Sequence, residues 1–308
     1  MIAPKVSIVI TCYNYERFVA TALRSALGQS FQDIEVILVD DGSTDGSEEK
    51  ILPFLSDPRL RYIKQANLGQ AKSKNRGIQE SSGVYVAFLD ADDQWAHDKL
   101  EKQTPLFNDP KVGVVYSRAN YIDGNDQLLD FALTDEFLQP RNGKVTEFLY
   151  MNNFVPFSSS VVRRECLEHL GAFDESLPMG IDWDLWLRLS THYQFNFVDE
   201  PLLLYRLGHS GQMSKNAETR HRCSDRIMSQ FIQQHPVAIS RGVQRKALAY
   251  TYCNRVEYYC GRDPFKSLLL SLKVVRLFPF ARRSYFSLLL SFRGILHKYK
   301  RAQVNTKL

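Results

Sequence analysis

The sequence lacks the features that mark several classes of protein. Its five cysteines are odd in number, scattered and never spaced as C-x-x-C. This argues against a zinc site or a disulfide framework and predicts reduced thiols. The amino terminus, MIAPKVSIVITCYN, has no basic segment followed by a long apolar stretch and a small-residue cleavage site. We therefore expect no signal peptide and a cytoplasmic location.

Glycine-rich phosphate loops are also missing. Neither G-x-G-x-x-G nor G-x-x-x-x-G-K-[ST] occurs in the chain, so we do not expect the backbone of such a loop to bind a phosphate. If the protein binds a diphosphate, a metal ion has to neutralise its charge. The question is then whether the sequence offers ligands for that ion.

Acidic residues are absent from the end of the chain. From Phe265 to Leu308 there are ten Lys and Arg and no Asp or Glu, so the net charge of +5 leaves −5 (5 minus 10) for the remainder. Two segments, 265–278 and 284–299, are apolar, aromatic and basic, yet neither has the 18 uninterrupted apolar residues of a spanning helix. They predict helices that contact the inner face of a membrane peripherally, or that pack on the preceding domain. Nucleic acid is not expected as a partner, because the basic residues are interleaved with Leu and Phe.

What the first half does contain is an alternation of short β-rich runs and amphipathic stretches. This alternation predicts an α/β fold, with a mainly parallel sheet and helices on both of its faces. Ligands of such sheets bind outside the carboxyl ends of the strands. The expected strands are 6–11, 34–40, 60–64 and 84–89, and the expected helices are 17–27, 45–55, 70–79 and 97–107. Further on we expect strands at 112–122 and 157–163, a loop-rich stretch at 123–153, a helix at 182–189 and only helices from about residue 217.

Three carboxylates follow the run VYVAFL, at Asp90, Asp92 and Asp93. Acids this close repel one another, so they are either turn and cap residues or ligands of a hard divalent cation such as Mg²⁺ or Mn²⁺. The strand at 34–40 likewise ends in Asp40 and Asp41. One of these two acids can satisfy turn amides, and the other can accept a hydrogen bond from a base or a ribose. Polar groups are therefore predicted to converge at one edge of the sheet.

Several motifs in a consistent order resemble glycosyltransferase family 2. They are VSIVITCYNYERFVATALRSALGQSF, VDDGSTDGS, NLGQAKSKNRGI, GVYVAFLDADD and IDWDLWLRL, and the likeness extends over about residues 4–210. The resemblance implies a GT-A-type doubly wound fold and an inverting transfer of sugar from a nucleotide-diphosphate donor. It implies a catalytic domain over 1–215, followed by a C-terminal helical, basic region over 216–308.

The resemblance also assigns roles to individual residues. Thr11 and Tyr13 match positions at the nucleobase, Asp41 matches the acid that reads the uracil N3–H, and Asp90 lies by the ribose in the DXD motif. The implied ligands of Mn²⁺ or Mg²⁺ are Asp92, which also serves the nucleotide, together with Asp93 and His209, and the implied general base is Asp182. Two positions depart from the family pattern. Lys74, grouped with the nucleotide site, stands where Arg is frequent, and Ile181 stands where Glu is common.

These parts suit an inverting transfer, in which a base deprotonates the acceptor hydroxyl while the diphosphate leaves from the opposite face. The resemblance favours a UDP-sugar donor and a glycan or lipid-linked acceptor in cell-surface polysaccharide synthesis. Two alternatives stay open. One is a catalytically inactive carbohydrate-binding or scaffold protein of the same fold. The other is a sugar-phosphate nucleotidyltransferase, although TCYNYERF does not resemble the G-G-x-G-T-R-L-type loop of those enzymes.

Overall fold

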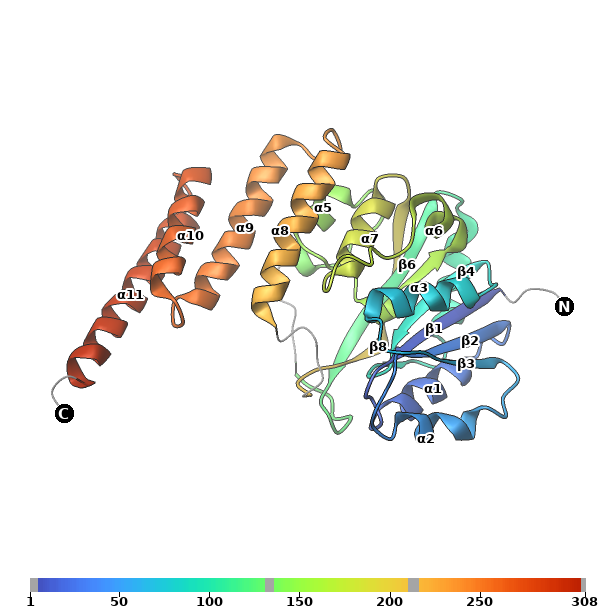
Figure 1. Ribbon diagram of the computed structural model, residues 1–308. Coiled ribbons are helices and arrows are strands. Elements are labelled where there is room, and N and C mark those ends of the chain that lie inside the picture. The colour runs from blue at the N-terminus through green and yellow to red at the C-terminus, as the bar shows by residue number, and fades with distance from the viewer. Residues whose placement is uncertain (1–4, 131–135, 210–215, 306–308) are drawn as a thin grey trace. The chain divides into compact units, whose positions relative to one another are not determined.

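The computed structural model describes residues 5–130, 136–209 and 216–305, which form two compact units (Figure 1). The first unit comprises Met1–Leu149 and Asn153–Pro236, and the second comprises Tyr150–Asn152 and Val237–Leu308. Helix α8 (Ala217–Gln234) therefore belongs to the first unit, whereas the sequence predicted a boundary at residue 215.

Within the described residues, the first unit has a single eight-stranded sheet with the order β3-β2-β1-β4-β7-β6-β8-β5. Parallel pairs join β1 to β2, β1 to β4, β2 to β3 and β6 to β8, whereas β7 and β5 pair antiparallel with their neighbours. The sheet is thus mixed, and the α/β class is confirmed. The strands are β1 (Val6–Cys12), β2 (Ile34–Asp40), β3 (Leu60–Lys64), β4 (Tyr85–Asp90), β5 (Gln94–Trp95), β6 (Val112–Ile122), β7 (Val161–Arg163) and β8 (Gln194–Arg206).

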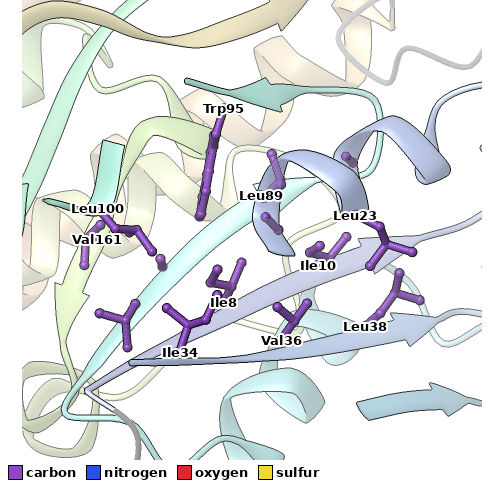
Figure 2. Close-up of a cluster of buried hydrophobic side chains, with 14 of the residues drawn as sticks. Ile8, Ile10, Leu23, Ile34, Val36, Leu38, Leu89, Trp95, Leu100 and Val161 are labelled. Carbon is purple, nitrogen blue, oxygen red and sulfur yellow. The ribbon is translucent and has the colours of Figure 1, made fainter. Parts of the chain in front are cut away.

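Helices cover both faces of this sheet because the strand side chains alternate between them. On one face, Ile8 and Ile10 pack in a buried cluster with Leu23 of α1, as Figure 2 shows. On the other face, Gly77 of α3 lies so close to β1 that a Cβ there would come within 2.3 Å of Val9 Cγ1. The helices of this unit are α1 (Val19–Leu27), α2 (Ser47–Ile51), α3 (Gln70–Glu80), α4 (Lys99–Gln103), α6 (Arg164–Leu170), α7 (Ile181–Ser190) and α8, together with most of α5 (Thr146–Met151), whose last two residues are assigned to the second unit.

The structure corrects one sequence expectation and adds elements at two other places. The stretch 157–163 is a strand only over β7, because 157–159 forms a 3₁₀ helix, η4. The interval from 123 to 153 is not only loop, since it holds α5 and a short 3₁₀ helix at Glu136–Leu138. Strand β8 was not expected at all, and it pairs along β6 with register shifts that accommodate its interior Asp199, Glu200 and Pro201.

The second unit is helical, with α9 (Arg241–Tyr259), α10 (Pro264–Leu277) and α11 (Arg282–Asn305). Two small apolar clusters hold α10 to α9, one around Cys253 and Val274 and one around Val256 and Leu270. No helix in the described part of the chain is both long and apolar enough to cross a membrane.

Candidate active site

The acid cluster lies where β1 and β4 end side by side. Thr11 of β1 is paired with Asp90 of β4 in the sheet register, and the loop after Asp90 carries the other two acids. One carboxylate oxygen from each of Asp90, Asp92 and Asp93 can be chosen so that all three lie within 4.8 Å of one another. The convergence predicted from the strand ends is therefore present.

Lys74 joins the two strand ends. Its Nζ donates to Asp90 Oδ1 at 2.6 Å and to Thr11 Oγ1 at 3.0 Å, and it lies 4.4 Å from the centroid of the Phe157 ring. Its side chain is buried and Asp90 is partly exposed. The position where the sequence has Lys in place of Arg thus supplies one buried positive charge to the cluster.

The acid cluster is joined by His209, which meets Asp92. His209 Nε2 lies 2.8 Å from Asp92 Oδ2, although the two residues are 117 positions apart in the sequence. The imidazole is held edge-on against two aromatic rings, with centroids 5.8 Å from Tyr15 and 5.3 Å from Phe18. His209 also lines a pocket of about 360 Å³ with residues 14–18 and Asp45. The structure therefore brings the predicted histidine to the predicted acid.

Asp93 is more deeply buried than its neighbours and is anchored at both oxygens. Ser158 Oγ donates to Asp93 Oδ2 at 2.5 Å, and the backbone N–H of Arg206 donates to Oδ1 at 2.8 Å. Ser158 Oγ also accepts the backbone N–H of Asp90 at 3.1 Å, so one hydroxyl ties both ends of the acidic loop. Sequence reasoning missed Ser158, because nothing in FSSS points to a partner 65 residues earlier.

Arg206 is a second residue that sequence reasoning missed. Its buried guanidinium donates to the carbonyl of Asp92 at 2.7 Å, to the carbonyl of Asp123 at 2.6 Å and to Asp126 Oδ1 at 2.5 Å. It also lies 4.4 Å from the Phe18 ring centroid. Only its position three residues before His209, in YRLGHS, could have drawn attention to it. Arg206 fixes the backbone from which Asp92 projects.

Asp90 and Asp93 of this cluster have raised pKa values. Burial raises the pKa of Asp93 well above its usual range, and the charges of Asp92 and Asp90 raise it further. Burial also raises the pKa of Asp90, against the opposing effect of Lys74. Burial and mutual repulsion thus disfavour the ionised forms of Asp90 and Asp93, and a bound cation would favour them. Oxygen donors with one imidazole nitrogen are a suitable set for Mn²⁺ or Mg²⁺, so the residues fit the implied ion.

Asp40 and Asp41 both have protein partners. Asp40 accepts the N–H of Ser43 at 2.8 Å and the hydroxyl of Tyr62 at 3.0 Å. Asp41 accepts hydrogen bonds at 2.9 Å from the side-chain amide of Gln65 and from the backbone N–H groups of residues 68 and 69. Asp41 therefore orders the turn that leads into α3, at the expected strand end. Its contact with a nucleobase stays a prediction.

Tyr13 lies in the loop after β1 and is 45% exposed. The next residue, Asn14, has a φ of 59°, and its side-chain oxygen accepts the N–H of Thr44 at 2.8 Å. Its own N–H donates to Ser43 Oγ at 3.0 Å. The loops after β1 and β2 are thus tied together, which leaves the Tyr13 ring at the surface beside the strand ends.

Asp182 is the second residue of α7, which begins at Ile181 after Gly180. Its Oδ2 accepts a hydrogen bond from Asn153 Nδ2 at 2.7 Å. Burial raises the pKa of Asp182, with a smaller contribution from the negative charge of Asp90, and hydrogen bonds from Trp183 N–H and Asn153 oppose the shift. Asp184 is different, since Arg188 Nε pairs with it at 2.9 Å. Of these two acids, Asp182 is the one without a cationic partner among the contacts described.

Comparison with known proteins identifies the family of this chain. Residues 7–171, more than half of the chain, match the model of the family described as glycosyl transferase family 2. The chain belongs to glycosyltransferase family 2. An uncharacterized glycosyltransferase from Nostoc is 32% identical to it over 83% of each chain. The amylovoran biosynthesis glycosyltransferase AmsB from Erwinia amylovora is 30% identical over 65% of this chain and 69% of its own.

Solved structures share the fold of this family 2 glycosyltransferase. TarS 1–349 from S. aureus, in complex with UDP-GlcNAc, superposes with a TM-score of 0.60 and 16% identity, covering 97% of this chain and 92% of its own. The mannosyltransferase PcManGT from Pyrobaculum calidifontis, in complex with GDP-Man and Mn²⁺, superposes with a TM-score of 0.59 and 18% identity, covering 99% of this chain and 79% of its own. Three related glycosyltransferases from Rickettsia species, each 26% identical, are covered over only 38–44% of their own lengths.

Proposed function

We propose that this glycosyltransferase moves a sugar from a nucleotide-diphosphate donor, in first place a UDP-sugar, to a hydroxyl of a glycan or lipid-linked acceptor, with inversion at the anomeric carbon. Cell-surface polysaccharide synthesis is the process that the Erwinia relative's name supports. The observation that carries the proposal is the meeting of Asp90, Asp92, Asp93 and His209 at the carboxyl edge of the sheet.

In this proposal the donor lies over the ends of β1, β2 and β4. Thr11, Tyr13 and Asp41 take the nucleobase and Asp90 takes the ribose, with Lys74 fixing Asp90 in place. UDP-GlcNAc bound to TarS supports a UDP-sugar, and GDP-Man bound to PcManGT shows that the fold also accommodates guanine. Which nucleobase the site accepts is therefore tested by a direct comparison of UDP-sugar and GDP-sugar donors.

Asp92, Asp93 and His209 would hold Mn²⁺ or Mg²⁺ in this site. When bound, the ion supplies charge neutralisation for the leaving diphosphate. The protein prepares the geometry: Arg206 and Ser158 fix the loop that carries Asp92 and Asp93. The complex of PcManGT with Mn²⁺ supports an ion of this kind. Of the two acids, Asp92 has the freer oxygens, because both oxygens of Asp93 already accept hydrogen bonds.

Asp182 acts as the general base in this proposal. Its carboxylate takes the proton from the acceptor hydroxyl as that oxygen attacks the anomeric carbon, and the bond to the diphosphate breaks on the opposite face. A pKa raised by burial makes Asp182 a stronger base than an ordinary carboxylate. The hydrogen bond from Asn153 orients it.

Calorimetry with a panel of nucleotides and nucleotide sugars tests the donor site. We expect UDP to bind in the presence of Mn²⁺ or Mg²⁺ and to lose most of its affinity in EDTA or in Asp92→Asn. Equal affinity in EDTA would show that the acid cluster does not serve a metal. A protein that binds UDP-sugars with metal, yet neither transfers nor hydrolyses them with any acceptor tested, would favour the inactive carbohydrate-binding alternative.

A further inference from the structure

Helices α10 and α11 meet through serine side chains, and several of their large apolar side chains face outward. Ser291 of α11 lies at the contact, with its Oγ 2.8 Å from Ser267 Oγ and 3.3 Å from Ser271 Oγ of α10. One turn away, Ser287 Oγ donates to Cys253 Sγ of α9 at 3.5 Å. At Gly294 a Cβ would lie 2.2 Å from the carbonyl oxygen of Cys260. Serines therefore form the polar seam between α10 and α11, and Ser287 and Gly294 of α11 approach α9 and the residue that follows it, beside the apolar cluster of Leu270 and Leu290.

The opposite faces of the same helices carry two outer stripes. The stripe of α10 consists of Phe265, Leu269 and Leu272, which are 50–63% exposed. The stripe of α11 consists of Tyr285, Leu289, Phe292 and Leu296, which are 51–62% exposed. In each helix these residues follow one another at i, i+4 and i+7, so they share one side. Nine of the 18 exposed large apolar side chains in the described residues fall between 265 and 296, which is more than scattered surface residues explain.

A water-facing helical hairpin normally has the reverse arrangement, with leucine and phenylalanine inside and polar residues outside. Seams of small residues that bring backbones close are typical of helices whose surroundings are apolar. The outer stripes of α10 and α11 are thus suited to an apolar partner. Because serines occupy the contact between α10 and α11, the exposed residues of the outer stripes do not form a core between these two helices.

The charge of the second unit indicates which partner this is. The unit contains 15 Lys and Arg and two acids, a net charge of +13 (15 minus 2), which leaves −8 (5 minus 13) for the rest of the chain. Exposed basic residues flank the stripes, as Lys273 does beside Leu272 and Arg293 beside Phe292. Two copies joined through this face would bring like charges together, which is unfavourable. An anionic surface is complementary.

We propose that α10 and α11 form a binding surface for anionic lipid membranes, with the outer stripes in the interfacial region and the flanking basic residues on the headgroups. Interfacial helices bind through apolar burial and through attraction to anionic lipid together. Each basic residue near such a surface strengthens binding about fivefold. The surface lies wholly within the second unit and does not depend on the reaction proposed for the first.

Point variants of the full-length protein test this surface. Removing α10 and α11 would uncover the cluster around Val256 and Tyr259, so a truncation would confuse binding with folding. The assay is co-sedimentation with vesicles of phosphatidylcholine alone and of phosphatidylcholine mixed with phosphatidylglycerol. Leu289→Asn with Leu296→Asn removes apolar area from the α11 stripe. Its matched control, Leu52→Asn with Leu55→Asn, alters exposed leucines of the first unit.

We expect the wild type and the control to bind the anionic vesicles at low salt and to release them as salt rises. The stripe variant should bind about tenfold more weakly or worse, and Lys273→Gln with Arg276→Gln should weaken binding at low salt only. Circular dichroism and thermal unfolding verify that each variant is folded. No binding by the wild type, equal binding by the stripe variant, or equal binding to neutral vesicles overturns the proposal. A dimer in sedimentation velocity that the stripe variant abolishes, without vesicle binding, assigns the face to a second copy and overturns it too.

Discussion

Asp182→Asn is the substitution that most directly tests the chemistry of the first unit. The asparagine has the same shape, and its carbonyl oxygen can still accept the hydrogen bond from Asn153 that Asp182 Oδ2 accepts at 2.7 Å. It cannot take a proton. A positioned general base contributes about 10²–10⁴-fold to the rate, which corresponds to about 2.7–5.4 kcal/mol in the transition state at 1.36 kcal/mol per tenfold.

We therefore expect kcat for sugar transfer to fall by that factor, while calorimetry shows unchanged donor binding. The thermal stability of Asp182→Asn, in contrast to its activity, should not decrease. Burial raises the pKa of Asp182, so its charged form is less favourable in the folded chain than in the unfolded one. The stability that this carboxyl contributes when protonated is lost as pH rises through the folded pKa. Asp182→Asn should then unfold at the same or a higher temperature at neutral pH.

The pH profile adds an independent check. Because the base must be ionised, activity should fall as pH drops through the raised pKa of Asp182. Asn153→Ala removes a hydrogen bond that favours the ionised form, so it should shift this acid limb to higher pH. Asp184→Asn, which breaks the pair with Arg188, is the control and should leave the limb in place. Turnover of Asp182→Asn within a few-fold of the wild type would refute the assignment.

Three further predictions concern the site and its support. Asp92→Asn should weaken Mn²⁺ binding about tenfold or more in calorimetry without nucleotide, and unchanged affinity would remove Asp92 from the ligand set. Arg206→Met leaves the partly buried carbonyls of Asp92 and Asp123 without their donor. It should cost about 3 kcal/mol, or about 6–12 °C in the unfolding temperature of a unit this size, and a change below 2 °C would contradict the anchoring role. Gly77→Ala should destabilise by about 1–3 kcal/mol because its Cβ would collide with Val9. Gly124→Ala, which meets nothing within 4 Å, is the control and should be near neutral.

The parts of the fold that could be predicted are those whose pattern is local. Strands β1, β2 and β4 are buried apolar runs that end in polar residues, so both the strands and the edge where they meet follow from the sequence. Strand β8 could not be found in this way. Its centre, Val198-Asp199-Glu200-Pro201, has the composition of a turn, and it stays extended only because β6 pairs with it on either side of the irregularity.

The residues of the candidate site likewise fall into those that a local sequence pattern indicates and those that it does not. The acids Asp90, Asp92 and Asp93 fall within four consecutive residues, so the sequence alone indicates that they repel one another. His209 was placed with them only through the family resemblance. Ser158 and Arg206 have ordinary neighbours in the sequence, and their partners lie 65 and 114 residues away. A residue whose role is to hold a distant backbone leaves no local signal, and only the folded chain reveals it.

The end of β8 has a consequence for how the protein is made. Residues 206–209 supply both the N–H group that holds Asp93 and the imidazole that meets Asp92, and they leave the ribosome more than a hundred residues after those acids. A nascent chain that has completed β1 to β4 carries the acids without either partner. Pairing across so long an interval forms slowly, because loop closure has to be achieved before the contact stabilises it. Binding of the proposed metal ion should therefore be among the last properties this unit acquires during synthesis, and it can serve as a reporter of completed folding.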